Sequence, residues 1–220
     1  MPSLPIFPLG TVLLPGAPLP LQLFEPRYLT MLQELMALPE QSRVFGVVAL
    51  RRGHEVGPEA ALDLHEVGCA ARVEAVAAVP SPGGPRYHIL AVGTRRFRLE
   101  QIDPRAQTPY LTGRVTWLGE PEGPDGAAAA LAVRVAAEHA AYRRVLGAEP
   151  VALPEDPGAL AYRVADSTVL ALAERQRVLA APDTAARLRL VGHLLRRERT
   201  LVEQFRAVPQ TPDLGGGGLN

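Results

Sequence analysis

The sequence contains no lysine, and all 23 of its basic residues are arginine. This absence excludes several kinds of chemistry that depend on a lysine amine. A P-loop uses lysine to reach the β- and γ-phosphates of a nucleotide. A Ser–Lys dyad needs an amine that can lose its proton, whereas arginine stays protonated, and a Schiff base needs a primary amine. We therefore expect neither ATP hydrolysis through a P-loop nor peptide cleavage through such a dyad, and we expect no enzyme activity.

The sequence is also poor in cysteine and in long apolar runs. Its single cysteine, Cys69, cannot form an internal disulfide. No apolar run reaches the roughly 18 residues that a membrane span needs. The first residues lack the basic start and apolar stretch of a secretory signal. Together these absences predict a cytoplasmic protein with no membrane partner.

An excess of charge of either sign is missing as well, because 23 basic and 23 acidic residues give a formal net charge of zero. A protein that neutralises phosphates usually carries excess positive charge. The balance therefore disfavours a nucleic-acid partner, although it leaves a local basic patch open. Hydrophobic residues make up 47% of the chain, which is typical of a folded globular protein.

The N-terminal part of the chain carries proline-containing apolar pieces and one helical pattern. Proline cannot donate to a β-ladder, so we predict edge strands or strand ends at residues 4–9, 11–16 and 19–24. Helical spacing of apolar residues predicts a helix over residues 26–38. A compact apolar run then predicts a buried strand at residues 44–50, followed by a loop at residues 54–64.

The clearest strand pattern lies in the middle of the chain. Every second residue from Val67 to Val79 is apolar, which predicts one long strand with a single buried face. A turn at residues 80–84 leads into a returning strand that Gly93 and Thr94 are expected to break. A further strand is predicted at residues 110–118.

The pattern changes to helices after residue 118. We predict a first helix that Asp125 caps, a second that Asp156 caps and that continues to Leu179, and a third that opens at Asp183 and extends to Phe205. Strands followed by helices predict an α+β fold. The expected parts are a β-rich lobe at 1–118, a helical bundle lobe at 119–208 and a flexible glycine-rich tail at 209–220.

Several stretches occur in an order that is typical of one family. The opening at residues 4–16 and the phrase Phe-Glu-Pro-Arg-Tyr at residues 24–28 are followed by similar stretches at residues 45–48, 67–73, 91–97 and 160–166. Together they resemble the N-terminal substrate-binding domain of Lon proteases, from about residue 4 to 205. The resemblance implies a PUA-like antiparallel β-barrel lobe with one early helix, followed by a C-terminal helical bundle. It also implies polypeptide binding without a cofactor, and cereblon contains a similar domain.

The phrase at residues 24–28 and the helix after it supply the candidate binding residues. A polypeptide-binding surface here would use Phe24, Glu25, Arg27, Tyr28, Met31, Leu35 and Met36. Methionines suit such a role because they adapt to varied partners. The structural alternative is that Glu25 and Arg27 fix the corner between strand and helix by a charge-assisted bond, while Phe24 and Tyr28 enter the core. Met31, Leu35 and Met36 equally fill a core.

Other reactive residues are weaker candidates. Cys69 with His65 suggests a thiol nucleophile, but its place on the apolar face of the long strand predicts an inert buried side chain. The five histidines show no close spacing that would predict a metal site. Two arginine clusters, Arg95–Arg98 and Arg196–Arg199, leave an RNA-binding surface of PUA-like type open, but the neighbouring glutamates favour a solvated face.

The leading functional hypothesis is a non-catalytic module that binds unfolded or hydrophobic polypeptide segments, as an adaptor or in a chaperone-like role. The expected route is apolar burial in a groove between the lobes, with strand addition at a proline-free sheet edge. A protease or a chaperone is the expected further partner. The alternative from another class is an RNA-binding protein, and the third is a hydrolase that works through Cys69 or a serine.

Overall fold

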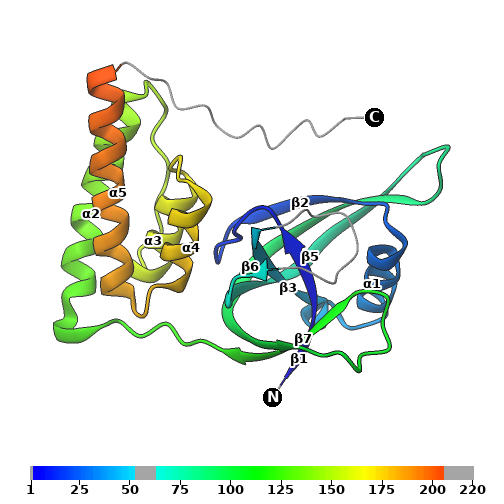
Figure 1. Ribbon diagram of the computed structural model, residues 1–220. Helices are drawn as coiled ribbons and strands as arrows, with labels where there is room; N and C mark the ends of the chain where they lie inside the picture. The colour runs from blue at the N-terminus through cyan, green and yellow to red at the C-terminus, as the bar shows by residue number, and fades with distance from the viewer. Residues whose placement is uncertain (1, 53–62, 206–220) are drawn as a thin grey trace. The chain divides into compact units, whose positions relative to one another are not determined.

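The computed structural model describes residues 2–52 and 63–205 (Figure 1). The chain forms two compact units, Met1–Pro121 with Leu172–Ala181, and Glu122–Ala171 with Pro182–Asn220. Three predicted features lie outside the described residues: most of the loop at residues 54–64, the side chain of Phe205 and the tail at 209–220. In chain order the elements are β1 (Ser3–Leu9), β2 (Pro18–Leu23), α1 (Pro26–Met36), η1 (Glu40–Ser42), β3 (Val44–Arg52), β4 (Asp63–Leu64), β5 (Val67–Val79), β6 (Arg86–Ile102), β7 (Leu111–Trp117), η3 (Pro124–Gly126), α2 (Ala127–Val145), α3 (Pro157–Asp166), α4 (Leu172–Ala180) and α5 (Thr184–Phe205).

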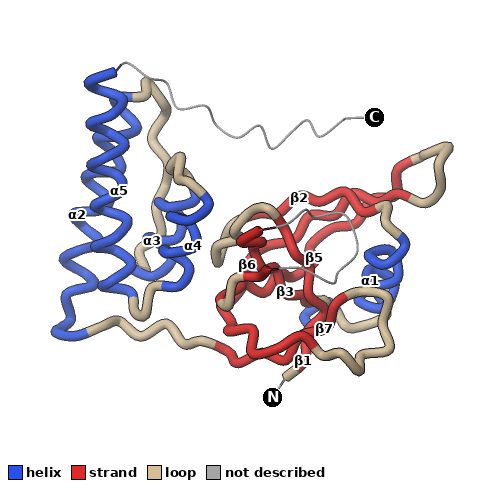
Figure 2. Tube along the Cα trace, viewed as in Figure 1, coloured by secondary structure: helices blue, strands red, loops and turns tan. Residues whose placement is uncertain are grey.

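The strands of the first unit form a barrel-like ring (Figure 2). Strands β1, β7, β6, β5 and β3 pair in this order, and β1 also pairs with β3, which closes the ring. All of these pairings are antiparallel except the parallel pairing of β1 with β3. Strand β2 lies outside the ring and pairs with β6. The predicted α+β class, with an antiparallel barrel and one early helix before the later helices, is confirmed.

The interior of the ring is filled by apolar side chains around Phe97. The buried cluster comprises Leu4, Ile6, Val48, Ala70, Phe97 and Val115. Glycines make room for the Phe97 ring, because a Cβ atom at Gly68 would lie 2.6 Å from its Cζ atom and one at Gly46 would lie 2.8 Å from it. The close approach of the ring to two strands is thus possible only where those strands lack a side chain.

Of the three pieces predicted as edge strands or strand ends, those at residues 4–9 and 19–24 form strands, β1 and β2, but β1 is not an edge strand along its whole length. Strand β1 is a central element, because Ser3–Ile6 pair with β7 and Ile6–Leu9 pair with β3. Each half of β1 pairs with only one neighbouring strand. Pro5 and Pro8 can therefore sit in the strand, because the side on which a proline lacks an N–H donor need not have a partner strand. Residues 11–16 form no strand, although their apolar side chains are buried. Only β2, with its two prolines, pairs on one side as predicted.

The predicted break at Gly93 and Thr94 is also wrong, because β6 runs unbroken from Arg86 to Ile102. Gly93 serves a close approach instead. Its N–H donates to Ala17 O at 2.9 Å, and its carbonyl accepts from Gly16 N at 2.8 Å. A Cβ atom at Gly93 would lie only 2.2 Å from the carbonyl oxygen of Leu14. The glycine therefore lets the loop after β1 lie directly against the strand.

Arg96 was expected on a solvated face, and this prediction is wrong. Its side chain is only 2% exposed. The guanidinium donates to the carbonyls of Leu179, Ala181 and Gly119 and forms an ion pair of 2.7 Å with Glu120. Strand β6 is therefore buried on both sides here, by Phe97 facing the core and by Arg96 facing α4. These bonds hold α4 within the first unit.

The helices of the second unit lie close to the predicted ranges, with two differences. Asp156 caps α3 by accepting the N–H of Ala159 at 2.7 Å, as predicted. The residue at the start of α2 is Gly126 rather than Asp125. The second predicted helix is interrupted after α3, where Ser167 and Thr168 hydroxyls donate to the Val164 carbonyl and satisfy the helix end. None of the described helices is long and apolar enough to span a bilayer.

Candidate functional site

The corner at residues 24–28 is held by a charge pair and by ring stacking. Arg27 lies 2.9 Å from the Glu25 carboxylate and 4.6 Å from the centre of the Tyr28 ring. The Tyr28 ring stacks on Phe7, with 4.0 Å between ring centres. The predicted bond between Glu25 and Arg27 and the predicted burial of Tyr28 are confirmed. Both fix the direction in which α1 leaves β2.

Phe24 departs from the structural alternative, because its side chain is 53% exposed rather than part of the core. The Arg86 guanidinium lies 5.5 Å from the centre of its ring. On the next helix Met31 and Leu35 are buried, and Met36 is exposed at its end. Of the candidate binding residues, the structure therefore presents Phe24 and Met36 to solvent and packs Tyr28, Met31 and Leu35 inside.

A partly apolar surface continues from Phe24 across three strands. The register places Pro20 opposite Leu90 and Leu90 opposite Ala75, with Gln22, His88 and Ala77 in the next row of the same face. Side chains directly opposite one another point to the same side of a sheet. Leu90 is 41% exposed, and the alanines are exposed too. We call Pro20, Phe24, Ala75, Ala77 and Leu90 the ribbon face; its strands lie along the projecting β5–β6 hairpin (Figure 1).

The end of β5 forms an edge of this hairpin. Beyond Arg72, β5 pairs with β6 alone among the described strands, and a register shift lies between Val73 and Ala75. The expected single buried face therefore ends at Val73, and Ala75 and Ala77 are exposed. Residues 75–79 read Ala-Val-Ala-Ala-Val, with neither charge nor proline. We call them the edge segment, since their outer main-chain groups have no paired strand in the described part of the chain.

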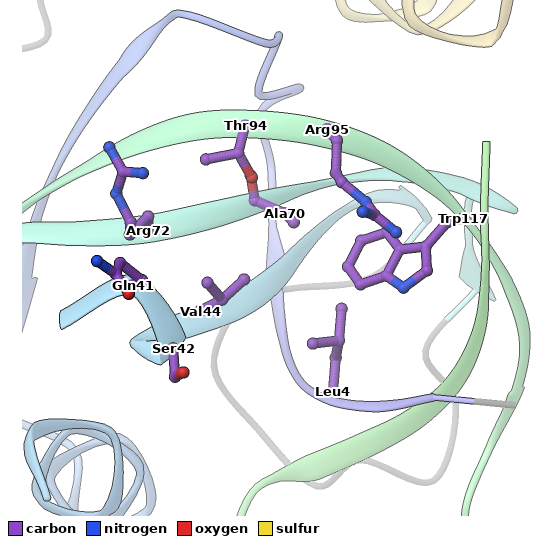
Figure 3. A pocket seen from close by; sticks show the side chains of 9 residues that line it. All are labelled: Leu4, Gln41, Ser42, Val44, Ala70, Arg72, Thr94, Arg95 and Trp117. Carbon is purple, nitrogen blue, oxygen red and sulfur yellow. The ribbon is translucent and has the colours of Figure 1, made fainter. Parts of the chain in front are cut away.

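A pocket of about 340 Å³ opens at one end of the ring (Figure 3). All ring strands contribute to it, together with the short helix η1. Its apolar lining residues are Leu4, Val44, Ala70 and Trp117, and its polar lining residues are Gln41, Ser42, Arg72, Thr94 and Arg95. Figure 3 shows the Arg95 side chain lying over the indole of Trp117, with 3.6 Å between the guanidinium carbon and the ring centre. We call this the barrel-mouth pocket.

The residues that could suggest catalysis contribute to packing and to helix contacts instead. Cys69 is fully buried, as predicted, and burial raises the pKa of its thiol to about 12. A thiol with such a pKa is almost entirely protonated near neutral pH and is a poor nucleophile. His139 Nε2 lies 2.9 Å from Ser167 Oγ, a pairing that the sequence did not predict. No carboxylate hydrogen-bonds to His139 among residues 2–52 and 63–205, and the pair joins α2 to the end of α3.

The arginine clusters do not form a continuous cationic track. Arg96 is buried, and Arg98 lies 3.3 Å from Glu66. In the second cluster Arg197 pairs with Glu198, and Arg199 lies 3.5 Å from Glu138. Arg196 and Arg197 are exposed, so the expected solvated face is confirmed for these residues of the second cluster. Nearby carboxylates repel phosphates and weaken the case for RNA binding.

The fold and these surfaces place the chain among α+β proteins with a PUA-like barrel and a following set of helices. It belongs to the family of ATP-dependent protease La (LON) substrate-binding domains, whose model matches residues 3–197. Lon protease 2 of Myxococcus xanthus is 31% identical over 208 residues, which cover 91% of this chain and 24% of that protein. Protein cereblon of Danio rerio is 34% identical over 105 residues, or 47% of this chain and 23% of that protein.

A solved relative confirms the fold. The crystal structure of a Lon N-terminal domain protein from Xanthomonas campestris matches with a TM-score of 0.62 and 26% identity, over 89% of this chain and 98% of that chain. The chain spans about a quarter of the length of the curated Lon proteases that it matches.

Sequence reasoning expected strand addition at a proline-free sheet edge but did not locate that edge, and it missed the ribbon face and the pocket. The uncharged run at residues 75–79 is a visible signal for an aggregation-prone or partner-binding edge, once a strand is known to pair on one side only. The pocket had no such signal. Its lining comes from strands far apart in the sequence, and Arg95 is indistinguishable from its neighbours until the chain is folded.

Proposed function

We propose that this chain is a non-catalytic module that binds unfolded or hydrophobic polypeptide segments, using the edge segment and the ribbon face. The family match and the relatives named Lon protease support polypeptide binding as the general activity. The observation that carries the proposal is the uncharged, proline-free edge of β5, which lies beside exposed apolar side chains of β6 and β2.

The edge segment suits an extended client because it offers main-chain hydrogen-bonding groups of any sequence. An added strand is held by its own main chain, so such a site accepts many clients. Strand β2 is a poorer template, since Pro18 and Pro20 lack the N–H that a new partner strand needs. Folded proteins usually protect such edges with charge or proline. Residues 75–79 carry neither.

The ribbon face adds an apolar contribution beside the edge. Phe24 and Leu90 are 53% and 41% exposed. Covering a large apolar side chain completely stabilises a complex by about 1.5–3 kcal/mol, so covering the exposed part of each contributes roughly half of that. A native globular protein has its apolar side chains inside and offers few for this contact, whereas an unfolded client offers many.

The remaining candidate residues have supporting positions in this proposal. Glu25 and Arg27 hold the corner from which Phe24 projects. Tyr28, Met31 and Leu35 anchor α1 in the core of the first unit. Met36 is 37% exposed and is proposed as a second contact on α1. The proposal also includes a role as an adaptor or chaperone-like holder. It further includes association with a protease or chaperone and a cytoplasmic location.

Equilibrium titration against a reduced and alkylated, permanently unfolded protein and against its native form tests this function. Ordering a flexible client costs several kcal/mol, so we expect a Kd on the order of micromolar or weaker for the unfolded form, and no measurable binding of the native form. A Phe24→Ser/Leu90→Ser double variant should bind the unfolded form about tenfold more weakly, because it loses the two largest apolar contacts.

Val133→Ser is the matched control for the double variant. Val133 is an apolar residue of α2 that is 72% exposed and lies in the second unit. The change removes exposed apolar surface without touching the ribbon face, and we expect no change in affinity. Equal affinity for the native and the unfolded form contradicts the proposal, and so does an affinity loss of equal size in the control.

A further inference from the structure

The barrel-mouth pocket is chemically unlike the ribbon face, because it combines a cation with an apolar wall in a recess. Its volume of about 340 Å³ falls at the lower end of the range of small-molecule sites. Residues from β1, β3, β5, β6 and β7 converge on it, so a rigid ring holds its walls. Such a recess suits one end group of a chain rather than an extended segment.

The charges at the pocket favour a single negative charge. Arg72 is already paired, with 2.6 Å between its guanidinium and the Glu74 carboxylate. Arg95 stacks on Trp117, and no ion pair joins it to an acidic side chain within the described part of the chain. One uncompensated guanidinium matches a carboxylate, which it binds through paired hydrogen bonds. A phosphate dianion needs more positive charge than Arg95 alone supplies.

The neutral residues of the pocket define what lies next to that carboxylate. Leu4, Val44 and Ala70 line the pocket beside the Trp117 ring, and Figure 3 shows Leu4 below that ring. Ser42 and Gln41 add polar groups at the rim, where main-chain amides of a ligand can form hydrogen bonds. The ligand therefore combines a carboxylate, an apolar group and a neighbouring amide within a few bonds.

We propose that the barrel-mouth pocket binds the C-terminal residue of a polypeptide whose last side chain is apolar. The terminal carboxylate pairs with Arg95, and the last side chain packs against Leu4 and Val44. At a chain end the carboxylate and the apolar side chain are bonded to the same Cα atom. An internal aspartate or glutamate carries its carboxylate on a side chain, and the nearest apolar group belongs to another residue. The inference rests on the proposed polypeptide-binding function and adds recognition of one chain end.

The protein contains a single tryptophan, Trp117, so its fluorescence reports directly on this pocket. The experiment titrates the protein with a hexapeptide that ends in leucine, as the free acid and as the C-terminal amide. We expect a fluorescence change with the acid and about tenfold weaker binding of the amide, equivalent to about 1.4 kcal/mol. Equal binding of the acid and the amide overturns the proposal.

Two variants locate the carboxylate. Arg95→Gln should reduce binding of the free acid to the level of the amide, measured by fluorescence anisotropy of a labelled peptide. Arg98→Gln is the matched control, since Arg98 lies on the same strand, is exposed and pairs with Glu66 outside the pocket lining. Retained discrimination between acid and amide in Arg95→Gln, or its equal loss in both variants, overturns the assignment.

Two further probes separate other sources of the anion. Inorganic phosphate should not displace the peptide acid at equal concentration, and N-acetyl-leucine should bind more weakly than the hexapeptide. Displacement by phosphate, or tighter binding of the small acid, contradicts recognition of a polypeptide end. The two proposals fail separately: the unfolded client tests the ribbon face without reference to the end group. If the acid and amide bind alike while that client still binds, only the pocket assignment is lost.

Discussion

The guanidinium of Arg96 in β6 donates a 2.7 Å hydrogen bond to the main-chain oxygen of Leu179, at the end of α4. The same side chain binds the carbonyls of Ala181 and Gly119 and the carboxylate of Glu120. A cation at the C-terminal end of a helix satisfies carbonyls that have no partner within the helix. Arg96 thereby couples a helix from the later part of the chain to the barrel that carries the proposed binding surfaces.

Replacement of Arg96 by methionine should destabilise the first unit strongly. Methionine keeps most of the side-chain volume but removes the hydrogen bonds to three carbonyls and the ion pair with Glu120, so we expect a loss of about 3 kcal/mol in the free energy of unfolding. Urea denaturation followed by Trp117 fluorescence measures this loss. Arg98→Met is the control and should change stability by less than about 0.5 kcal/mol, because Arg98 forms an exposed ion pair. Equal effects of the two changes contradict the assigned role of Arg96.

Gly93→Ala should also be destabilising, for a steric reason. The added methyl group would lie 2.2 Å from the Leu14 carbonyl oxygen, and main-chain atoms cannot move aside as a flexible side chain can. We expect a loss of about 2–3 kcal/mol by urea denaturation, in the upper range for overpacked sites. Gly119→Ala serves as the comparison, since a Cβ atom there meets nothing within 4 Å. Stability of Gly93→Ala at the wild-type level would show that the loop does not lie against β6.

The sequence predicted those elements that local patterns determine. The alternation over Val67–Val79 and the helical spacing after Pro26 gave β5 and α1 with nearly their observed bounds. Asp156 was recognisable as a cap because capping depends on residues within one turn. Local patterns failed where distant contacts decide. Gly93 looks like a strand break until Leu14 is seen against it, and Arg96 looks solvated until α4 covers it.

The candidate site was predicted only in part for the same reason. The corner formed by Glu25 and Arg27 is local and was predicted with its ion pair. The exposure of Ala75 and Ala77 depends on where β3 stops pairing with β5. Apolar residues in a sequence do not reveal whether they serve a core or a surface. The missing lysines, by contrast, bear on chemistry directly and needed no structure.

Hydrogen exchange at residues 75–79 tests whether a client adds as a strand. In the free protein, main-chain amides on the outer side of the edge segment have no strand partner among the described residues and should exchange quickly. An unfolded client at saturating concentration should slow these amides about tenfold or more, because each gains a hydrogen bond. Amides of β2 provide the internal comparison and should change little. Unchanged exchange at residues 75–79, with the client bound, restricts binding to side-chain contacts and excludes strand addition.

The pairing of His139 with Ser167 predicts a pH dependence of the second unit. Burial, followed by the charges of Arg143 and Arg163, lowers the pKa of His139 below its usual value of 6.5. The unfolded chain therefore binds this proton more tightly than the folded chain does. The stability that neutral His139 contributes is complete above about pH 6.5 and is lost as the pH falls from there towards the lowered pKa.

Urea unfolding followed by far-ultraviolet circular dichroism, at about pH 7.5 and about pH 5.5, measures this dependence. We expect the wild type to lose more stability on acidification than His139→Gln, because glutamine keeps a polar group near Ser167 but takes up no proton in this range. The pKa of His65 is also lowered, by burial and then by Arg51, but His65 is present in both proteins and cancels from the comparison. Parallel loss of stability in the two proteins would mean that His139 is protonated within the folded unit at no cost, contrary to its burial between α2 and α3.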